Sequence, residues 1–153
     1  MNEKLVQPET LPVEEIRLGG ILLRFMIDGP SSGRGLSLFE MTVQPAARVP
    51  VPHYHENFDE TLYGVSATLR MTLDGKTIDL RPGDSLYIPR GAVHGFENPH
   101  SEPAKVLIVI TPGDRFGAQY FRDLAGVLAA GGPPAPEAFV AVMLRHGLIP
   151  AQP

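Results

Sequence analysis

Short apolar stretches separated by turn-forming residues recur through the middle of the chain. Their spacing is about eight to twelve residues, which is typical of the strands of a sandwich or barrel. The strongest turn signal is Asp74-Gly75, which separates candidate strands at 67–73 and 76–80. The sequence holds 16 glycines and 16 prolines, above the average usage of both residue types, as many tight turns require. The pattern therefore predicts an all-β fold.

The other predicted elements lie on both sides of this hairpin. Further strands are expected at 21–28, 35–43, 60–66, 85–88, 92–97 and 104–111. From Phe116 onward, apolar residues recur at spacings of three and four, which predicts a helix that ends at Gly131. A second short helix is predicted from about Pro136 to His146. The expected organisation is an N-terminal arm at 1–18, a barrel at 19–113 and a helical extension at 114–153 that packs on the barrel.

The composition excludes several classes of site and partner. The chain has no cysteines, so any metal must be held by nitrogen and oxygen donors. Its formal net charge of −4 gives no electrostatic reason to expect a nucleic-acid partner. The longest aliphatic run, 106–110, is far too short for a membrane helix, and residues 1–18 contain no apolar core of signal-peptide length. We therefore expect a cytoplasmic protein with neither a membrane nor a nucleic-acid partner.

Two histidine-bearing stretches contain a candidate metal site. In an extended strand, alternate side chains point the same way about 6.6 Å apart, so His53 and His55 can present two imidazoles to one ion. Glu60 follows after a short stretch that can turn the chain back, and His94 lies on a later strand. Three imidazoles and one carboxylate suit a divalent transition metal, with Fe, Mn, Ni, Co, Cu and Zn all open.

The same stretches resemble the two signature motifs of the cupin family. The second reads Gly83, five residues, Pro89, one residue, Gly91, two residues, His94, three residues and Asn98, which is the family pattern without a mismatch. The first gives His-x-His, four residues and Glu, but Ala47 and Ala67 stand where the family usually has glycine. The resemblance covers about 35–112. It implies a jelly-roll barrel (a double-stranded β-helix) and the metal ligands His53, His55, Glu60 and His94, with each histidine binding through Nε2.

The two-helix tail resembles bacterial quercetin-dioxygenase-like cupins. This resemblance implies a non-haem metal-dependent dioxygenase that acts on a small aromatic or enolisable substrate, with Glu60 as ligand, catalytic base or each in turn. Four protein ligands would leave two positions open on a six-coordinate ion. The alternatives are a small-molecule-binding cupin without turnover and a metal-dependent isomerase of a sugar-like substrate.

Substrate-pocket candidates follow from strand parity. Phe96 shares the face of His94, and Phe39, Met41 and Leu62 are expected to share the same cavity, although each also suits an ordinary core position. A homodimer is the expected assembly, because cupins of this size are commonly dimers and an open barrel leaves strand edges that another chain can cover. The arm at 1–18 or an edge strand would contribute to its interface.

Overall fold

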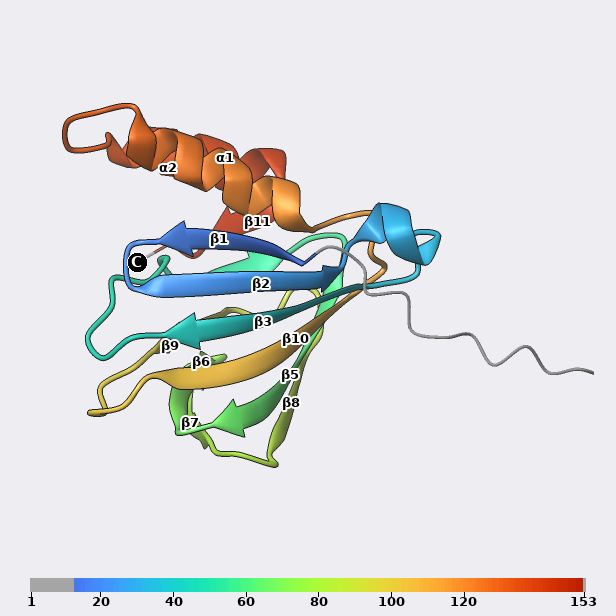
Figure 1. Ribbon diagram of the computed structural model, residues 1–153, viewed down its shortest axis with the longest axis vertical. Coiled ribbons are helices and arrows are strands. Elements are labelled where there is room, and N and C mark those ends of the chain that lie inside the picture. The colour runs from blue at the N-terminus through green and yellow to red at the C-terminus, as the bar shows by residue number, and fades with distance from the viewer. Residues whose placement is uncertain (1–12, 153) are drawn as a thin grey trace, which may run out of the picture.

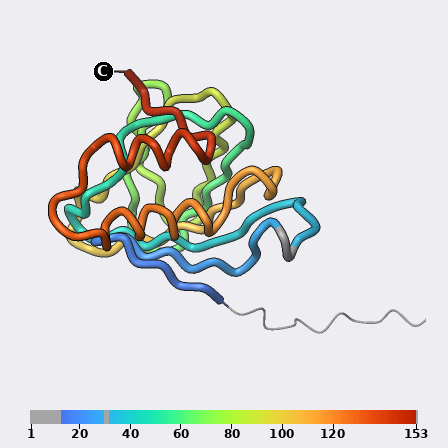
Figure 2. Tube along the Cα trace, turned by 90° about the horizontal axis from the view of Figure 1, so that it is seen from above, coloured from blue at the N-terminus to red at the C-terminus, as the bar shows by residue number. Residues whose placement is uncertain are grey.

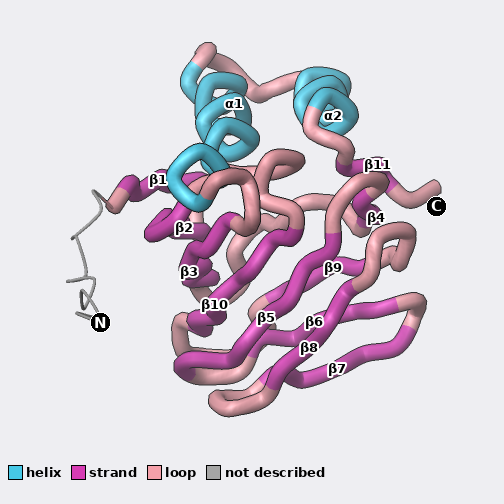
Figure 3. Tube along the Cα trace, turned by 90° about the vertical axis from the view of Figure 1, so that its right-hand side faces the viewer, coloured by secondary structure: helices cyan, strands magenta, loops and turns pink. Residues whose placement is uncertain are grey.

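The computed structural model describes residues 13–152, whose strands form two antiparallel sheets. One sheet contains, in spatial order, β1 (Glu14–Leu18), β2 (Ile21–Ile27), β3 (Ser37–Val43), β10 (Ala104–Thr111), β5 (Asp59–Ser66) and β8 (Ser85–Ile88). The other contains β11 (Leu148–Pro150), β4 (His53–His55), β9 (His94–Glu97), β6 (Leu69–Leu73) and β7 (Lys76–Leu80). The two sheets face each other in Figure 1 and Figure 3. The predicted all-β jelly-roll fold with two C-terminal helices is confirmed.

Alternation along the strands places the core between the sheets. In β10, Ala104, Val106, Ile108 and Ile110 are buried, and the residues between them are half-buried. The neighbouring β3 repeats the pattern, since every second residue from Ser37 to Val43 is buried. A period of two is what a strand with one buried face requires. The core is therefore specified by side-chain parity.

The Asp74-Gly75 turn joins β6 and β7 as the sequence predicts. Both residues have positive φ, 46° and 78°, as a two-residue hairpin with primed turn geometry requires. The register pairs Leu73 with Lys76 and Leu69 with Leu80. The turn thus fixes which side chains of β6 face the interior.

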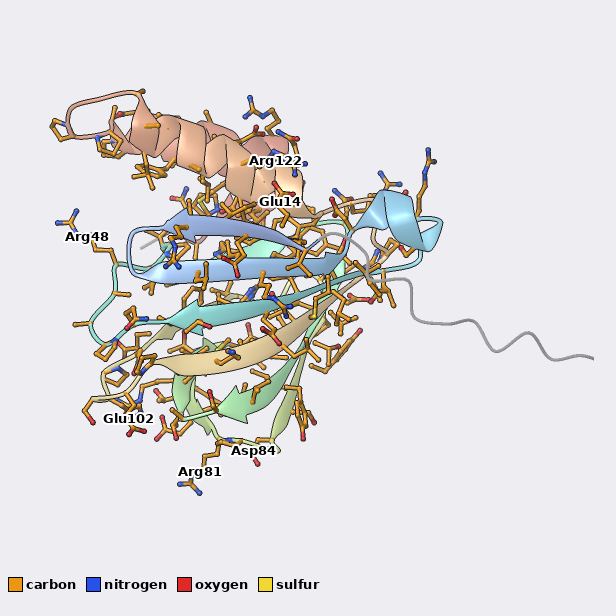
Figure 4. All side chains as sticks on the ribbon, viewed as in Figure 1. Glu14, Arg48, Arg81, Asp84, Glu102 and Arg122 are labelled. Carbon is orange, nitrogen blue, oxygen red and sulfur yellow. The ribbon has the colours of Figure 1, made fainter. Side chains whose placement is uncertain are left out.

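A helical cap lies over one end of the barrel. It consists of α1 (Ala118–Ala129) and α2 (Pro136–Arg145), which lie side by side in Figure 2. Helix α1 packs on β1 and α2 on β11, so the helix pair connects the edges of the two sheets. An ion pair between Arg122 of α1 and Glu14 of β1 joins the cap to the first sheet (Figure 4). A short 3-10 helix, Gly29–Ser32, lies between β2 and β3.

Two strands lie outside the predicted barrel 19–113. Strand β1 falls within the predicted arm 1–18, for which at most a short strand was expected, and its residues pair along their whole length with β2. Strand β11 was missed, because Gly147 and Pro150 indicated only the end of a helix; instead Leu148 pairs with His55 and Pro150 with His53. Residues 1–12 lie outside the described part of the chain. The boundaries 1–18, 19–113 and 114–153 remain predictions.

No helix within residues 13–152 is both long and apolar enough to cross a membrane. The cytoplasmic location, the absence of a nucleic-acid partner and the homodimer remain predictions. The strands available as edges in the described residues are β1 and β8 in one sheet and β11 and β7 in the other.

Ala46→Gly is expected to stabilise the fold by about 0.5–1 kcal/mol. Ala46 is exposed and has a φ of 54°, a left-handed conformation that costs a residue with a Cβ roughly 1–2 kcal/mol. Glycine removes that strain but loses roughly 0.5–1 kcal/mol of backbone entropy, so relief of strain wins. Urea unfolding measures the difference. As the matched control, the exposed helical Ala141 should lose about 1 kcal/mol when replaced by glycine, and equal effects at both sites would contradict this account.

Candidate metal centre

Three buried histidines converge at the cavity between the sheets. His53 and His55 lie on the same face of β4, and His94 begins β9 directly opposite His53 in the register. Their exposed fractions are 7%, 3% and 4%. One ring nitrogen from each lies within 4.8 Å of the nitrogens of the other two. Two strands of one sheet therefore supply three potential metal donors.

Glu60 reaches the same point from the other sheet. It lies on β5, between Ile110 of β10 and Ile88 of β8. Its Oε2 lies 3.3 Å from His94 Nε2 and 3.7 Å from His55 Nε2. Among the described residues, only the three histidines have donor atoms that all lie within 4.8 Å of one another. Glu60 is not part of this group and therefore lies at one side of the cluster. Its predicted role as a fourth ligand remains a prediction.

Backbone hydrogen bonds orient two of the imidazole rings. The Nδ1 of His53 donates to the Val51 carbonyl oxygen at 2.9 Å, and the Nδ1 of His94 donates to that of Ala92 at 3.0 Å. With Nδ1 donating to the backbone, Nε2 is the ring atom that can bind a metal once it carries no proton. For His55, Nδ1 is buried without a hydrogen-bond partner among the described residues, and stacking on Phe58 at 4.2 Å positions the ring instead.

Burial and mutual repulsion keep two of the imidazoles neutral in the metal-free protein. Burial lowers the pKa of His55 to about 3, although the Glu60 carboxylate opposes the shift, and burial also lowers the pKa of His53. Burial would lower the pKa of His94 and raise that of Glu60, but their hydrogen bond and the attraction between charges in the cluster together outweigh it, so the pKa of His94 is raised and that of Glu60 is lowered. Glu60 is therefore ionised at neutral pH and can accept a proton.

The remaining residues of the second motif shape the backbone. Gly83 and Gly91 have φ values of 90° and 85°, a region that favours glycine. Asn98 is buried, and its side-chain amide donates to the carbonyl oxygens of Val43 and Glu102 at 2.9 and 2.8 Å. The two glycines and the Asn98 hydrogen bonds thus shape the turns and strand ends around the site.

The histidines and Glu60 line a small, largely apolar cavity of about 50 Å³. All four predicted pocket residues line it: Phe39, Met41, Leu62 and Phe96. The cap adds side chains that were not predicted at the site, namely Phe116, Tyr120 and Phe121 from α1 and the loop before it, and Leu148 from β11. The helical stripe from Phe116 predicted burial of this face, but nothing in the sequence indicated that it faces the histidines.

The comparisons with known proteins place the chain in a family. A model of the cupin domain matches residues 39–110, which contain His53, His55, Glu60 and His94. Polyketide synthase CurC of Streptomyces cyaneus is 32% identical over 115 residues, which cover 70% of this chain and 71% of CurC. The chain belongs to the cupin superfamily. The cupin motifs identified in the sequence are therefore confirmed as family motifs.

Other relatives of this cupin differ in how much they share with it. Quercetin 2,3-dioxygenase of Bacillus subtilis is 40% identical over 74 residues, which cover 48% of this chain but only 21% of the dioxygenase. Among solved structures, the polyketide cyclase RemF from Streptomyces resistomycificus matches with a TM-score of 0.57 and 27% identity, over 69% of this chain and 78% of RemF. KdgF from Halomonas sp., at 23% identity and a TM-score of 0.57 over 65% of this chain and 86% of KdgF, shows the fold alone.

The donor set of this cupin fits a divalent transition metal. The three imidazoles converge, are buried, and in two cases are held in the Nδ1-protonated form by backbone carbonyls. Nitrogen donors with one carboxylate suit Fe, Mn, Co, Ni, Cu or Zn and leave the choice among them open. The three histidines can therefore form a metal site.

Proposed function

We propose that this cupin is a metal-dependent dioxygenase that acts on a small aromatic or enolisable substrate. The observation that carries the proposal is the convergence of three buried histidines and one ionised carboxylate in a largely apolar cavity. In this proposal His53, His55 and His94 hold the metal through Nε2. The metal, when bound, supplies a Lewis acid and open positions for substrate oxygen and dioxygen.

Glu60 is the proposed catalytic residue. Its Oε2 lies 3.3 Å from His94 Nε2 and faces the cavity, where it can take the proton of a substrate hydroxyl or acidic C–H. Phe39, Leu62 and Phe96 exclude water around the transferred proton and provide the apolar wall that an aromatic or enolic substrate needs.

The cavity lining disfavours the isomerase alternative. An isomerase of a phosphorylated or acidic sugar needs cations that face the metal, and no lysine or arginine lines this cavity among residues 13–152. The ionised Glu60 carboxylate beside the histidines provides a base, which turnover needs and passive binding does not. Glu60 therefore favours a catalytic function over passive binding.

A second candidate, an oxygen-independent cyclase, is favoured by one observation. The matches to CurC and RemF extend over most of each protein, whereas the match to quercetin dioxygenase covers a fifth of that enzyme. Cyclisation of a polyketide and oxygenation of a flavonol can both begin with removal of a proton, from an enolisable ketone in the first case and from an enolic hydroxyl group in the second. The same metal and base therefore suit either reaction. The two candidates differ in whether oxygen is consumed.

Oxygen uptake by the metal-loaded protein tests the proposal. Fe(II)- or Mn(II)-loaded protein is expected to consume oxygen with a member of a panel of catechols, β-diketones and flavonols. Glu60→Gln should lower the rate by about 100-fold or more, the usual size of a general-base contribution, while the metal content falls far less.

The matched control is Glu40→Gln on β3. Glu40 pairs with Arg24 and does not line the cavity, so this variant should keep the rate of the parent protein. Absence of oxygen uptake across the panel would contradict the dioxygenase. Conversion of a β-diketone substrate without oxygen uptake would favour the cyclase instead.

A further inference from the structure

A surface groove lies against the outer side of the metal cavity. Its volume is about 800 Å³, whereas the cavity holds about 50 Å³, too little for an aromatic ring with substituents. The groove is formed by the loop after β2, which includes Gly29 and Arg34, and by the segment from Gly113 to the first turn of α1. Phe116 lines both the groove and the cavity. Its side chain therefore forms the wall between the two spaces.

The backbone at Phe116 is hydrogen-bonded, so an opening of this wall would require its side chain to rotate. The Phe116 carbonyl oxygen accepts a hydrogen bond of 3.1 Å from the buried Ser37 hydroxyl. Phe116 is 7% exposed, and its ring stacks on that of Phe58 with 4.9 Å between the ring centroids. The Phe58 ring in turn stacks on His55. Phe116 thus connects the groove to a metal-site histidine through one ring. Rotation of a side chain is a faster and smaller change than displacement of a helix.

The groove is lined by three arginines, Arg34, Arg115 and Arg122, and by two aspartates, Asp28 and Asp114. Of its three arginines, Arg122 pairs with Glu14, and Arg115 lies 3.8 Å from Asp114. Arg34 has no ion pair within residues 13–152. An exposed guanidinium at the mouth of a groove attracts anions and raises their rate of arrival. Arg34 is therefore the groove residue best placed to attract a carboxylate or a similar anionic group of a ligand.

We propose that this groove is the entrance to the metal cavity, that Phe116 is the gate residue that limits which ligands pass, and that Arg34 gives the entrance a preference for small acids. The proposal rests on the metal centre of the proposed function but not on the reaction. In the productive complex the reacting oxygen lies in the cavity and the rest of the substrate lies in the groove. Phe116 then determines specificity by size.

Removal of bound Co²⁺ by planar chelators tests the gate without any turnover. Dipicolinate, a dianion, and 1,10-phenanthroline, a neutral molecule, are added in excess to the Co²⁺-loaded protein, and the loss of the cobalt absorbance is followed. Phe116→Ala is expected to speed removal by both chelators about tenfold or more, because the wall is lost. Phe116→Leu, which keeps more of the packing, should give a smaller increase in the same direction.

Phe139→Ala is the matched control for the gate. Phe139 of α2 is partly buried against the core but lines neither the cavity nor the groove, so its loss weakens the packing of the cap without removing the wall. Removal of Co²⁺ should stay close to the rate of the parent protein. Equal acceleration in Phe116→Ala and Phe139→Ala would overturn the gate, as would an unchanged rate in both Phe116 variants while Co²⁺ still binds.

Arg34→Ala tests the charge preference. At low salt it should slow removal by dipicolinate about two- to threefold and leave phenanthroline unaffected. Arg48→Ala is its control, because Arg48 is exposed but does not line the groove; Figure 4 shows it at the far end of the β1 and β2 strands from the 3-10 helix. Equal effects of the two arginine variants would overturn the acid preference. Failure of the parent protein to bind Co²⁺ would overturn the metal centre and the gate together.

Discussion

His55→Ala is expected to abolish metal binding and leave the barrel folded. His55 contributes one of three converging nitrogens, and its loss removes both a donor and the ring that stacks on Phe58. Changes to residues that only orient a ligand already cost about 10–100-fold in affinity, so loss of a ligand should cost more than ~100-fold. Titration with Co²⁺, followed by visible absorbance, measures the affinity, and circular dichroism measures the fold.

His100→Ala provides the comparison for this variant. His100 lies in the loop after β9, outside the cluster of three histidines, so Co²⁺ affinity should stay within about twofold of the parent value. Full Co²⁺ binding by His55→Ala, or an equal loss of affinity in both variants, would show that the ion is held elsewhere.

The metal-free protein is expected to lose stability steeply as the pH falls from 6.5 toward 4. The folded-state pKa of His55 is lowered to about 3, whereas an unfolded histidine titrates near 6.5. Between these values the unfolded chain binds a proton that the folded chain rejects, so stability falls by about 1.4 kcal/mol for each pH unit. The lowered pKa of His53 adds to the slope. A fall of two pH units therefore removes a large share of the free energy of unfolding, which is ~5–15 kcal/mol for a typical domain.

The other two titrating groups do not reverse this trend. Glu60, with a lowered pKa, stabilises the fold at neutral pH and loses that contribution below about 4.5, in the same direction. His94, with a raised pKa, stabilises the fold fully below 6.5 and loses that contribution only as pH rises through its folded pKa. Urea unfolding at pH 7, 6, 5 and 4 measures the slope. His55→Gln should flatten it, and an unchanged slope in that variant would contradict the burial account.

Local patterns in the sequence predicted the barrel well because each strand has one buried face. Parity alone placed His53 with His55 and His94 with Phe96, and the structure puts all four on the cavity. The Asp74-Gly75 turn was identified because its two positive φ values suit few other residue pairs. These features depend on neighbours in the sequence, which is why one sequence suffices to predict them.

Features that depend on distant pairing were not predictable in the same way. Strand β11 is three residues long and contains a proline, and only its pairing with β4 makes it a strand. The apolar stripe that includes Phe116 and Tyr120 predicted a buried helix face but gave no sign of what it covers. Likewise Ala67 keeps a φ of 55° at a position where the family has glycine, because the surrounding strands determine the turn despite the cost to alanine.

The volume of the cavity limits the substrates that the proposed reaction can use. About 50 Å³ beside the histidines has room for one oxygen-bearing group of a substrate but not for a complete flavonol. A larger substrate must therefore place its remaining part outside the cavity, and the groove beyond Phe116 is the adjacent space of sufficient size. In the proposed gate and reaction, the cap and the loop after β2 select substrates by size and charge, while the histidines and Glu60 carry out the chemistry.

The metal content of the protein tests the central claim most directly. The chain is purified without a chelating tag and analysed for transition metals before and after loading with one equivalent of Fe(II), Mn(II) or Co(II) followed by gel filtration. The convergence of His53, His55 and His94 predicts close to one ion per chain in the loaded protein, and almost none in the His55→Ala variant treated in the same way. Loaded protein that retains no ion, or a His55→Ala variant that retains as much as the parent, would contradict the account.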